Sequence, residues 1–477
     1  MNLGALAALP LAAAAAASAA AAGTGSAARL PREGAQSRQE LFNFKDLQYY
    51  AELTAGTPPQ KFTGVIDTGS FELVLFSKVC EDCGRAAVYD AGASASHRSG
   101  TLANSLVYGS GEIQANQSCD VLSIGPFQAK DQCFWEGFAA SMPLLANANF
   151  QSIIGIGPPE TPAADAWAFA KSSVGRVSKY FRRHLGQPLP DYLVSQADQD
   201  LSMALQISRA KPLLSNFEVR SFSVCLGKRP GSSGFLVWND ATALEQPELF
   251  QRLPVVGKHT WTVHMAGVHL SERLPVPAGE ETISLSGCAG GCGAVIDSGT
   301  SLLVMPSEAV DAFVHLLSSR IGPGCSNLHQ LPDIVFSLDG LEVSLGPDAY
   351  MGQVSGSLPA YIQDVVRIRR VQVEDSSSMG RCEVAVMESF TRTDRGPLWI
   401  LGMPFFRKYY ATFDLGSSAG ERSIHVSLAS DACTPVSPEA PVAVDERRTH
   451  VQRREIDLSH VMPPSILRQA RQDFVHV

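Results

Sequence analysis

The chain has 477 residues, of which 45% are apolar and 18% are charged, and its formal net charge is −9. This length and apolar content predict two sizeable hydrophobic cores and argue against a disordered or fibrous protein. No stripe rich in lysine and arginine and interleaved with aromatic residues is found in the body of the chain, so nucleic acid is not expected as a partner.

The N-terminal segment, residues 1–22, is an alanine-rich apolar run that ends in small residues. This pattern predicts a signal peptide that is cleaved between about Ala22 and Gly25. No lysine or arginine precedes the run, so a low-complexity tail or a poorly inserting anchor is the alternative. No later stretch reaches ~18 continuous apolar residues, and no stable membrane span is expected once the signal is removed.

The cysteine count also indicates the secretory route. Ten cysteines are present, an even number as five bridges require. A zinc site built from the CxxC at Cys80 and the CxxxC at Cys288 is the competing explanation, but no histidine with ligand spacing accompanies these motifs. A redox-active CxxC is disfavoured because its surroundings lack a βαβ pattern. We therefore expect no metal and no cofactor.

The body of the chain is predicted to be mainly β. Residues 23–41 are mostly polar and predict a short pro-segment or a disordered lead, with order beginning near Phe42. From there, short alternating runs such as QYYAEL and ELVLFS are separated by Gly, Pro, Asn and Asp. Helical patterns are expected over Ala163 to Leu185 and over Pro306 to Ser319, with Ser307 as a helix cap.

The residues after Cys433 are proline-rich and then strongly charged. Such a composition buries little apolar surface, so residues 434–477 are predicted to form a flexible charged tail. A short amphipathic helix over Pro464 to Val477 is the alternative to an unstructured end.

An internal repeat organises the body of the chain. The sequence VIDTGSFELVLFS at Val65–Ser77 returns as VIDSGTSLLVMPS at Val295–Ser307. Each copy is followed much later by two apolar residues and a glycine, at 153–155 and at 400–402. Two homologous lobes, residues 42–218 and 219–433, that each contribute one loop to a shared cleft are the simplest interpretation.

Each repeat carries a carboxylate where an apolar strand ends in a tight turn, Asp67 in the first copy and Asp297 in the second. A single Asp-(Thr/Ser)-Gly is usually an ordinary turn, but two copies between strongly apolar strands favour a functional pair, because burying an aspartate is costly. Two facing carboxylates share one proton. Such a pair can activate a water, with one carboxylate taking its proton while the other protonates an amide carbonyl.

From about Phe42 to Asp431 the chain resembles the pepsin-like aspartic proteases. The two Asp loops carry this resemblance, together with LPDIVFSLDG at Leu331–Gly340 and WILGMPFFRKYYATFDL at Trp399–Leu415. It implies an all-β, two-lobed acid protease fold with a central cleft. It also implies a monomeric endopeptidase that cuts protein or peptide substrates at acidic pH, outside the cell or in a lysosome-like or vacuole-like compartment.

The resemblance also implies roles for individual residues. Catalysis would fall to Asp67 and Asp297. The tip of a flap over the substrate would consist of Tyr108, Gly109 and Ser110. The cleft beside the substrate would be lined by Gly69, Gly299 and Ser301, and hydroxyls that support the carboxylates would come from Ser70 and Thr300.

Disulfide pairs follow from the same resemblance. The implied bridges are Cys80–Cys83, Cys288–Cys292 and Cys325–Cys382. As a further hypothesis, we pair Cys225 with Cys433 and Cys119 with Cys133. The single glycosylation sequon found begins at Asn116, where an unused sequon is as plausible as an occupied one.

Three departures from the family pattern stand out. Val74 occupies the position at which many members carry a tryptophan that contacts the flap tyrosine. The lead before Phe42 is short and lacks the usual basic run, so inhibition by an N-terminal lysine cannot be carried over. Insertions are expected near Pro158–Glu218 and Tyr350–Met379, and they put pocket preference beyond inference.

Two other functions compete with proteolysis. One is a catalytically silent protein of the same fold that binds a peptide or another protein. The other is a surface adhesion or structural protein that keeps a catalytic relic. Both Asp residues, both glycines and the flap tyrosine are present, which favours the enzyme.

Overall fold

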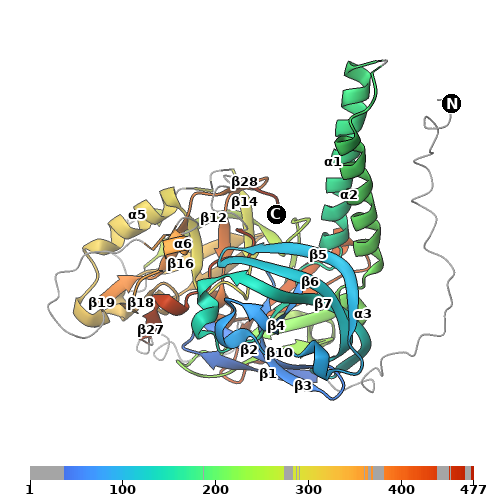
Figure 1. Ribbon diagram of the computed structural model, residues 1–477. Helices are drawn as coiled ribbons and strands as arrows, with labels where there is room; N and C mark the ends of the chain where they lie inside the picture. The colour runs from blue at the N-terminus through green and yellow to red at the C-terminus, as the bar shows by residue number, and fades with distance from the viewer. Residues whose placement is uncertain are drawn as a thin grey trace.

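The computed structural model describes residues 37–185, 187–272, 283–285, 287–288, 290–358, 360–363, 367–368, 381–437, 451, 453–467 and 474–477. The predicted signal peptide and residues 23–36 lie outside this part of the chain. Strands dominate the described residues, and they form the two-lobed β fold that the sequence predicts (Figure 1). The elements of the N-terminal half, in blue and cyan, make one lobe, and those drawn in yellow and orange make most of the other.

The N-terminal lobe is a continuous run of paired strands. Its central strands are strongly apolar, and most residues of β3, β4 and β8 are buried. Its strands are β2 (Gln48–Ala55), β3 (Gln60–Asp67), β4 (Leu73–Glu81), β5 (Arg98–Tyr108), β6 (Gly111–Ile124), β7 (Phe127–Ser141) and β8 (Ser152–Gly155).

A shared sheet joins the lobes at their base. It contains β1 (Ser37–Phe44), β9 (Ser221–Cys225), β10 (Gly234–Trp238), β11 (Gln251–Pro254), β24 (Tyr409–Asp414), β25 (Ser423–Ala429) and β26 (Pro435–Val436). Order is expected from Phe42, but Ser37 to Leu41 already pair with β10, and Leu41 is buried. The end of the predicted lead is therefore part of the fold.

The C-terminal lobe repeats the pattern with a second sheet. Its strands are β12 (Thr262–Ser271), β13 (Ile283–Ser284), β14 (Cys292–Ile296), β15 (Leu303–Pro306), β16 (Asp333–Leu338), β17 (Leu341–Leu345), β20 (Val386–Ser389) and β23 (Trp399–Leu401). Two small sheets complete the lobe. One contains β18 (Met351–Ser355), β19 (Arg381–Val384) and β27 (Glu455–Asp457), and the other β21 (Arg392–Thr393), β22 (Gly396–Pro397) and β28 (Phe474–Val475).

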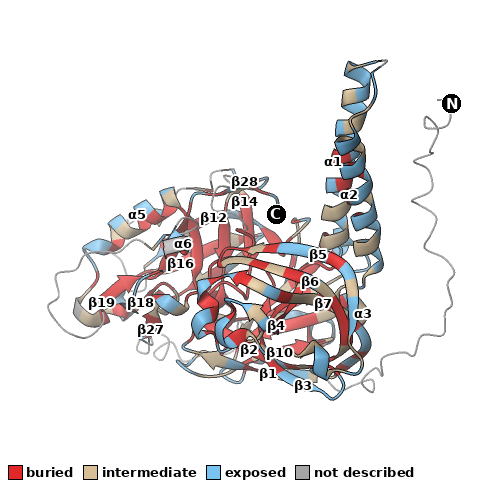
Figure 2. Cartoon of the chain, viewed as in Figure 1, coloured by how far each residue is buried: buried red, intermediate tan, exposed pale blue. Residues whose placement is uncertain are grey.

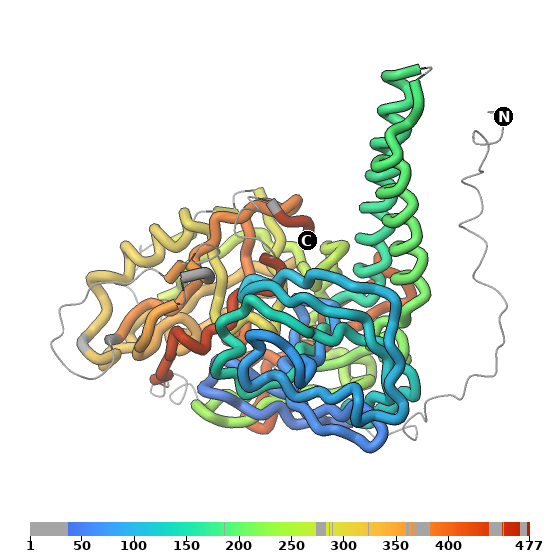
Figure 3. The backbone as a smooth tube through the Cα atoms, in the orientation of Figure 1, coloured from blue at the N-terminus to red at the C-terminus, as the bar shows by residue number. Residues whose placement is uncertain are grey.

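A helical hairpin projects from the N-terminal lobe. Its arms, α1 (Thr161–Arg183) and α2 (Asp191–Arg209), run antiparallel and extend well beyond the β lobes (Figure 3). The first arm matches the helix expected over Ala163 to Leu185, whereas the sequence pattern did not indicate the second. Figure 2 shows the contrast in burial, since the lobes enclose buried residues while most of the hairpin is exposed.

The remaining helices are short, apart from one. They are α3 (Leu213–Asn216), α4 (Thr242–Glu245), α5 (Ser307–Ser318), α6 (Ala360–Gln363) and α7 (Met403–Lys408). The helix expected at Pro306 to Ser319 is α5, but Ser307 is its first residue and not its cap. Its hydroxyl donates instead to Glu388, because β20 lies beside the start of the helix. Among the helices that the structure describes, none is long and apolar enough to cross a membrane.

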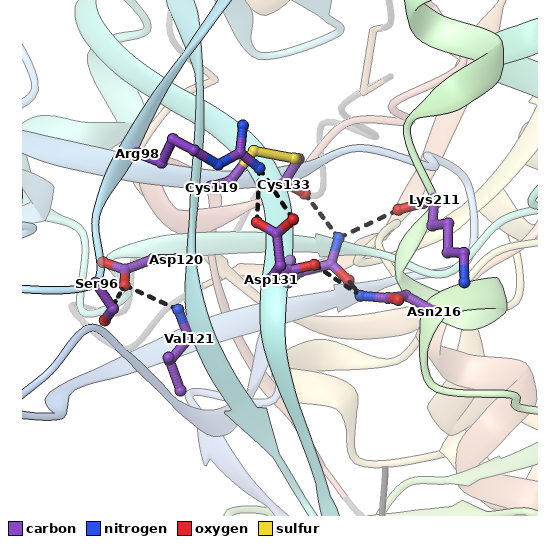
Figure 4. A network of polar contacts seen from close by, with 10 residues as sticks. Ser96, Arg98, Cys119, Asp120, Val121, Asp131, Cys133, Lys211 and Asn216 are labelled. Carbon is purple, nitrogen blue, oxygen red and sulfur yellow. Dashed lines mark hydrogen bonds and ion pairs between the residues drawn. A yellow bond between two sulfur atoms is a disulfide. The ribbon is translucent and has the colours of Figure 1, made fainter. Parts of the chain in front are cut away.

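A polar network at the base of the hairpin fixes the long strands β5 to β7 (Figure 4). The Cys119–Cys133 bridge joins β6 to β7, and Arg98 pairs with Asp131 at 2.7 Å. The side-chain amide of Asn216 donates to the Asp131 carbonyl at 3.2 Å, which ties the segment after α2 to β7. These two cysteines and Asp131 lie close together, but both sulfurs are consumed by the bridge and cannot act as thiolate ligands.

The C-terminal segment differs from the flexible tail that its composition predicts. Within residues 453–467, β27 pairs with β18, and every residue from Val461 to Leu467 is buried. Pro464 to Leu467 form a turn where a helix was the alternative, and 468–473 lie outside the described residues. The average charge of the tail conceals a short apolar stretch, VMPPSIL, that can bury its side chains.

Candidate active site

The two repeated Asp loops meet at the junction of the lobes. Asp67 ends β3 and Asp297 follows β14, and both side chains are almost fully buried. Each strand lies parallel to the apolar-apolar-Gly strand of its own lobe, β3 beside β8 and β14 beside β23. A Cβ on Gly402 would lie 2.2 Å from the Leu302 carbonyl oxygen, so the glycine of this motif allows the loop to pass closely.

Matching hydrogen bonds orient the two carboxylates. The Gly69 amide donates to Asp67 Oδ1 at 2.9 Å, and the Ser70 hydroxyl donates to Oδ2 at 2.7 Å. In the second loop the Gly299 amide and the Thr300 hydroxyl donate to Asp297 at 2.8 and 2.5 Å. The repeat in the sequence is thus a repeat of geometry.

The carboxylates face each other across the two glycines. A Cβ on Gly69 would lie 2.7 Å from Asp297 Oδ2, and one on Gly299 would lie 2.2 Å from Asp67 Oδ1. Burial, and then the charge of Asp67, raise the pKa of Asp297 well above its ordinary value. One proton is therefore retained between the two groups at a pH where exposed carboxyls would both be ionised.

A hydroxyl lattice that the sequence pattern did not single out locks the loops together. The Thr68 hydroxyl donates to the Ile296 carbonyl at 3.0 Å, and the Ser298 hydroxyl donates to the Ile66 carbonyl at 2.8 Å. The Ser298 amide also donates to the Thr68 hydroxyl at 2.8 Å. A hydroxyl residue directly after each Asp was the available signal, since both copies carry one.

The turn between β5 and β6 is the segment that the sequence predicts to be a flap. Tyr108 ends β5, and Gly109 and Ser110 form the tip before β6 begins. Tyr108 and Ser110 are buried at 6% and 8% exposure, and Tyr108 lies in one apolar cluster with Met462 of the C-terminal segment. Val74, which replaces the expected tryptophan, lies in the same apolar cluster as Tyr108 and supports the flap from below.

Comparison with known proteins agrees with this geometry. The family model described as eukaryotic aspartyl protease matches residues 48–181 and 213–421. The chain belongs to the eukaryotic aspartyl proteases. The match omits residues 182–212, so the second arm of the helical hairpin is an addition to the family fold.

Curated relatives of this aspartyl protease are similar over most of their length. Cathepsin E-A of Xenopus laevis is 25% identical over 389 residues, which cover 80% of each chain. Napsin-A of Homo sapiens is 29% identical over 422 residues, covering 84% of this chain and 83% of the relative. Cathepsin D of Gallus gallus is 26% identical over 390 residues, covering 78% and 80%.

In this aspartyl protease the cleft is occupied by its own C-terminal segment. The Ser465 hydroxyl donates to Asp67 Oδ2 at 2.6 Å. Ser301 holds the backbone of Met462 with two hydrogen bonds, from its amide to the Met462 carbonyl at 3.1 Å and from the Met462 amide to its hydroxyl at 2.8 Å. The Ser301 hydroxyl in turn donates to the Leu47 carbonyl at 2.6 Å.

A groove lies between the segment that follows the first Asp loop and the helical hairpin. Its volume is about 640 Å³, and its walls come from the loop after Ser70, from the flap strands and from both arms of the hairpin. The apolar lining includes Phe71, Leu73, Trp135, Phe169 and Met203. The insertion expected near Pro158–Glu218 therefore borders the region beside the carboxylates.

The ten cysteines form five bridges with the pairing expected from sequence. They are Cys80–Cys83, Cys119–Cys133, Cys225–Cys433, Cys288–Cys292 and Cys325–Cys382. Asn116 lies on β6 with an exposed side chain, and the use of its sequon stays a prediction.

Proposed function

We propose that this protein is an aspartic endopeptidase in which Asp67 and Asp297 jointly activate a water for attack on a peptide bond. The observation that supports this best is the symmetric arrangement of the two buried carboxylates, each held by a glycine amide and a hydroxyl. Family membership supports the same reaction class. Burial, and then the charge of Asp67, raise the pKa of Asp297, which suits a general acid.

The proposed reaction proceeds through a tetrahedral intermediate. The ionised carboxylate takes one proton from water as the oxygen bonds to the amide carbon, and the protonated Asp297 gives its proton to the carbonyl oxygen. When the intermediate collapses, the C–N bond breaks and the leaving nitrogen receives a proton from the carboxyl that took it. One hydroxyl of the intermediate returns its proton to Asp297 as the C=O bond of the acid forms. The products are a carboxylic acid and an amine, and the pair returns to one shared proton.

The substrate would be an extended peptide held between the flap and the second Asp loop. Ser301 offers both a backbone amide and a hydroxyl to a peptide backbone, as its contacts with Met462 illustrate. The groove lined by Phe71 and Phe169 would receive apolar side chains on the N-terminal-lobe side of the cut. Protein and peptide substrates are therefore the expected partners.

An acidic compartment on the secretory route is the proposed location. Five disulfides favour an oxidising environment. The relatives include cathepsins and a probable vacuolar protease, which supports an acidic compartment by analogy. Zymogen status and the signal peptide remain part of this proposal.

Cleavage of a denatured protein between about pH 3 and 7 tests the proposal. Because the C-terminal segment contacts Asp67, the full chain is used with Leu467→Asp, a change that should displace the segment. This variant is compared with the same variant carrying Asp67→Asn, with the same variant carrying Ser417→Ala as an exposed control, and with pepstatin added. Cleavage that disappears with Asp67→Asn and with pepstatin, but persists in Ser417→Ala, would support the proposed reaction. Cleavage that survives Asp67→Asn would exclude it.

A further inference from the structure

The C-terminal segment, residues 453–467, reaches the catalytic carboxylates over a chain of specific contacts. It enters along the C-terminal lobe, where β27 pairs in parallel with β18 and the Gln353 amide donates to the Arg454 carbonyl at 2.8 Å. A single helical turn, Leu458–His460, then redirects it toward the flap, and the His460 carbonyl accepts from the Gln48 side chain at 2.8 Å. The segment is thus built into both lobes.

Under the flap the segment takes the place of a substrate. Met462 is paired through both backbone groups to Ser301 of the second Asp loop, and its side chain packs in one cluster with Tyr108. The Pro464 carbonyl oxygen lies so close to the flap tip that a Cβ on Gly109 would be 2.4 Å from it. The backbone is therefore enclosed from above and from below.

At the carboxylates themselves the segment presents a hydroxyl. Ser465 Oγ is 2.6 Å from Asp67 Oδ2, and a water deprotonated by that oxygen would need the same position. Pro463 and Pro464 precede it, and neither has a backbone N–H that could pair with the flap. These features suit an occupant that blocks the cleft better than one that is cut.

Apolar and ionic anchors hold the segment on both sides of Ser465. Ile466 and Leu467 are buried at 6% and 2% exposure, in the cluster that contains Ile400 of the second lobe. At the other end, Arg454 is 3% exposed at its side chain and pairs with Asp46 at 2.8 Å. With both ends anchored, Asp67 and Asp297 are 1% and 0% exposed, and a substrate has no access to them.

We propose that residues 453–467 are a built-in inhibitor that lies in the substrate cleft and silences the enzyme until the segment is displaced. This inference rests on the proposed function and names its regulation. The inhibitor lies in the C-terminal part of the chain, more than 150 positions after the second Asp loop.

The test displaces the segment within the full chain. Leu467→Asp places a carboxylate in a buried apolar site, which is costly and should undock the segment. Leu244→Asp makes the same change at a side chain that is 75% exposed and serves as the matched control. Hydrolysis of an unrelated fluorogenic peptide at pH 4 should be at least about tenfold faster for Leu467→Asp than for the unaltered chain and Leu244→Asp.

A second variant guards against misfolding, because Leu467 contributes to a core. Ser465→Trp places a large ring where the hydroxyl now lies 2.6 Å from Asp67, so the lack of space should expel the segment without altering a core side chain. It should raise the rate in the same way. Circular dichroism and the melting temperature establish that each variant is folded.

A synthetic peptide with the sequence of residues 453–467 tests the cleft directly. Added to Leu467→Asp, it should raise KM for the fluorogenic substrate without changing kcat, and a scrambled peptide should have no effect. Mass spectrometry should recover the peptide uncut. Rapid cutting of the peptide, or equal activity of the unaltered chain and both displaced variants, would contradict the proposal that the segment is an inhibitor.

The outcomes separate this inference from the proposed function. If the displaced variants are folded and bind both pepstatin and the peptide but cut nothing, binding of the segment in the cleft is supported and the proposed proteolytic activity is contradicted. If the unaltered chain and the displaced variants cut equally and Asp67→Asn abolishes cutting, the proposed proteolytic activity is supported and the proposed inhibition is contradicted.

Discussion

Thr68 and Ser298 exchange hydrogen bonds across the junction of the lobes, with the Ser298 amide donating to Thr68 Oγ1 at 2.8 Å and the Thr68 amide donating to Ser298 Oγ at 3.2 Å. Both residues are nearly fully buried. Since each side chain also reaches a backbone carbonyl of the opposite loop, the two carboxylates next to them cannot move apart independently. The lattice explains how residues 230 positions apart keep a fixed geometry.

Thr68→Val should destabilise the protein and reduce turnover. Valine keeps the shape but leaves the buried Ile296 carbonyl and Ser298 amide without partners, at a cost of about 1–3 kcal/mol for each group. Urea unfolding measures the loss of stability, and Thr68→Ser, which keeps the hydroxyl, should restore most of it. If Thr68→Val unfolded at the same urea concentration as the unaltered chain, the hydroxyl lattice would not contribute to the free energy of unfolding.

Gly299→Ala should abolish most activity. The added methyl would lie 2.2 Å from Asp67 Oδ1, a contact that forces the carboxylates apart. A displacement of about 1 Å at a catalytic group costs roughly 10²-fold in rate. The comparison uses Leu467→Asp as the active background, and Gly420→Ala, which meets no atom within 4 Å, as the control. A Gly299→Ala variant with full kcat would contradict the close approach of the two loops.

Asp297→Asn should stabilise the protein more at pH 7 than at pH 4. A carboxyl whose pKa is raised in the folded state contributes stability that is present below its unfolded value and lost as the pH rises. A tenfold difference in proton affinity between the folded and unfolded states corresponds to about 1.4 kcal/mol. Melting temperatures of the two chains at pH 4 and pH 7 measure the effect. An equal difference at both pH values would mean that burial does not hold the proton on Asp297.

Asp46→Asn should weaken the docking of the C-terminal segment. Although burial opposes ionisation, the Arg454 and Arg407 guanidiniums keep the pKa of Asp46 below its ordinary value. Asparagine tolerates the positive φ of 59° at this position, and its side-chain oxygen can still accept from the Gly231 amide, so the change removes mainly the charge. An uncompensated buried Arg454 costs about 3–5 kcal/mol. Basal peptide hydrolysis should therefore rise, whereas Asp198→Asn on the exposed face of α2 should leave it unchanged.

Mild acid alone should not release the segment. Burial opposes ionisation of Asp457, but the hydrogen bond from Ser459 and the nearby Lys45 hold its pKa at about 2. The stabilisation from a depressed carboxyl pKa is lost only as the pH falls through the folded value, so it persists from pH 7 to pH 4. Burial and the nearby Lys45 lower the pKa of His460, so its protonation in acid offsets part of this stabilisation but leaves the Asp457 contacts in place. Hydrolysis by the unaltered chain should stay low after incubation at pH 4, and a spontaneous rise to the Leu467→Asp rate would contradict this.

Features that depend on local pattern could be predicted from the amino-acid sequence alone. Asp67 and Asp297 were found because each loop repeats the same strand, turn and glycine, and those requirements are met by neighbours in the chain. The first arm of the hairpin followed from its periodicity, and three of the cysteine pairs, such as Cys325–Cys382, followed from the family resemblance.

The distant residues that complete the site could be identified only from contacts in the folded protein. The roles of Thr68 and Ser298 depend on the opposite loop, and nothing in either loop alone specifies a partner. The C-terminal segment resembled a charged tail because composition averages over its length, whereas its seven buried residues from Val461 to Leu467 are stabilised by contacts with a cleft built about 160 to 400 positions earlier. Hydrophobic burial and hydrogen bonding act between surfaces, and those surfaces exist only once both lobes have folded.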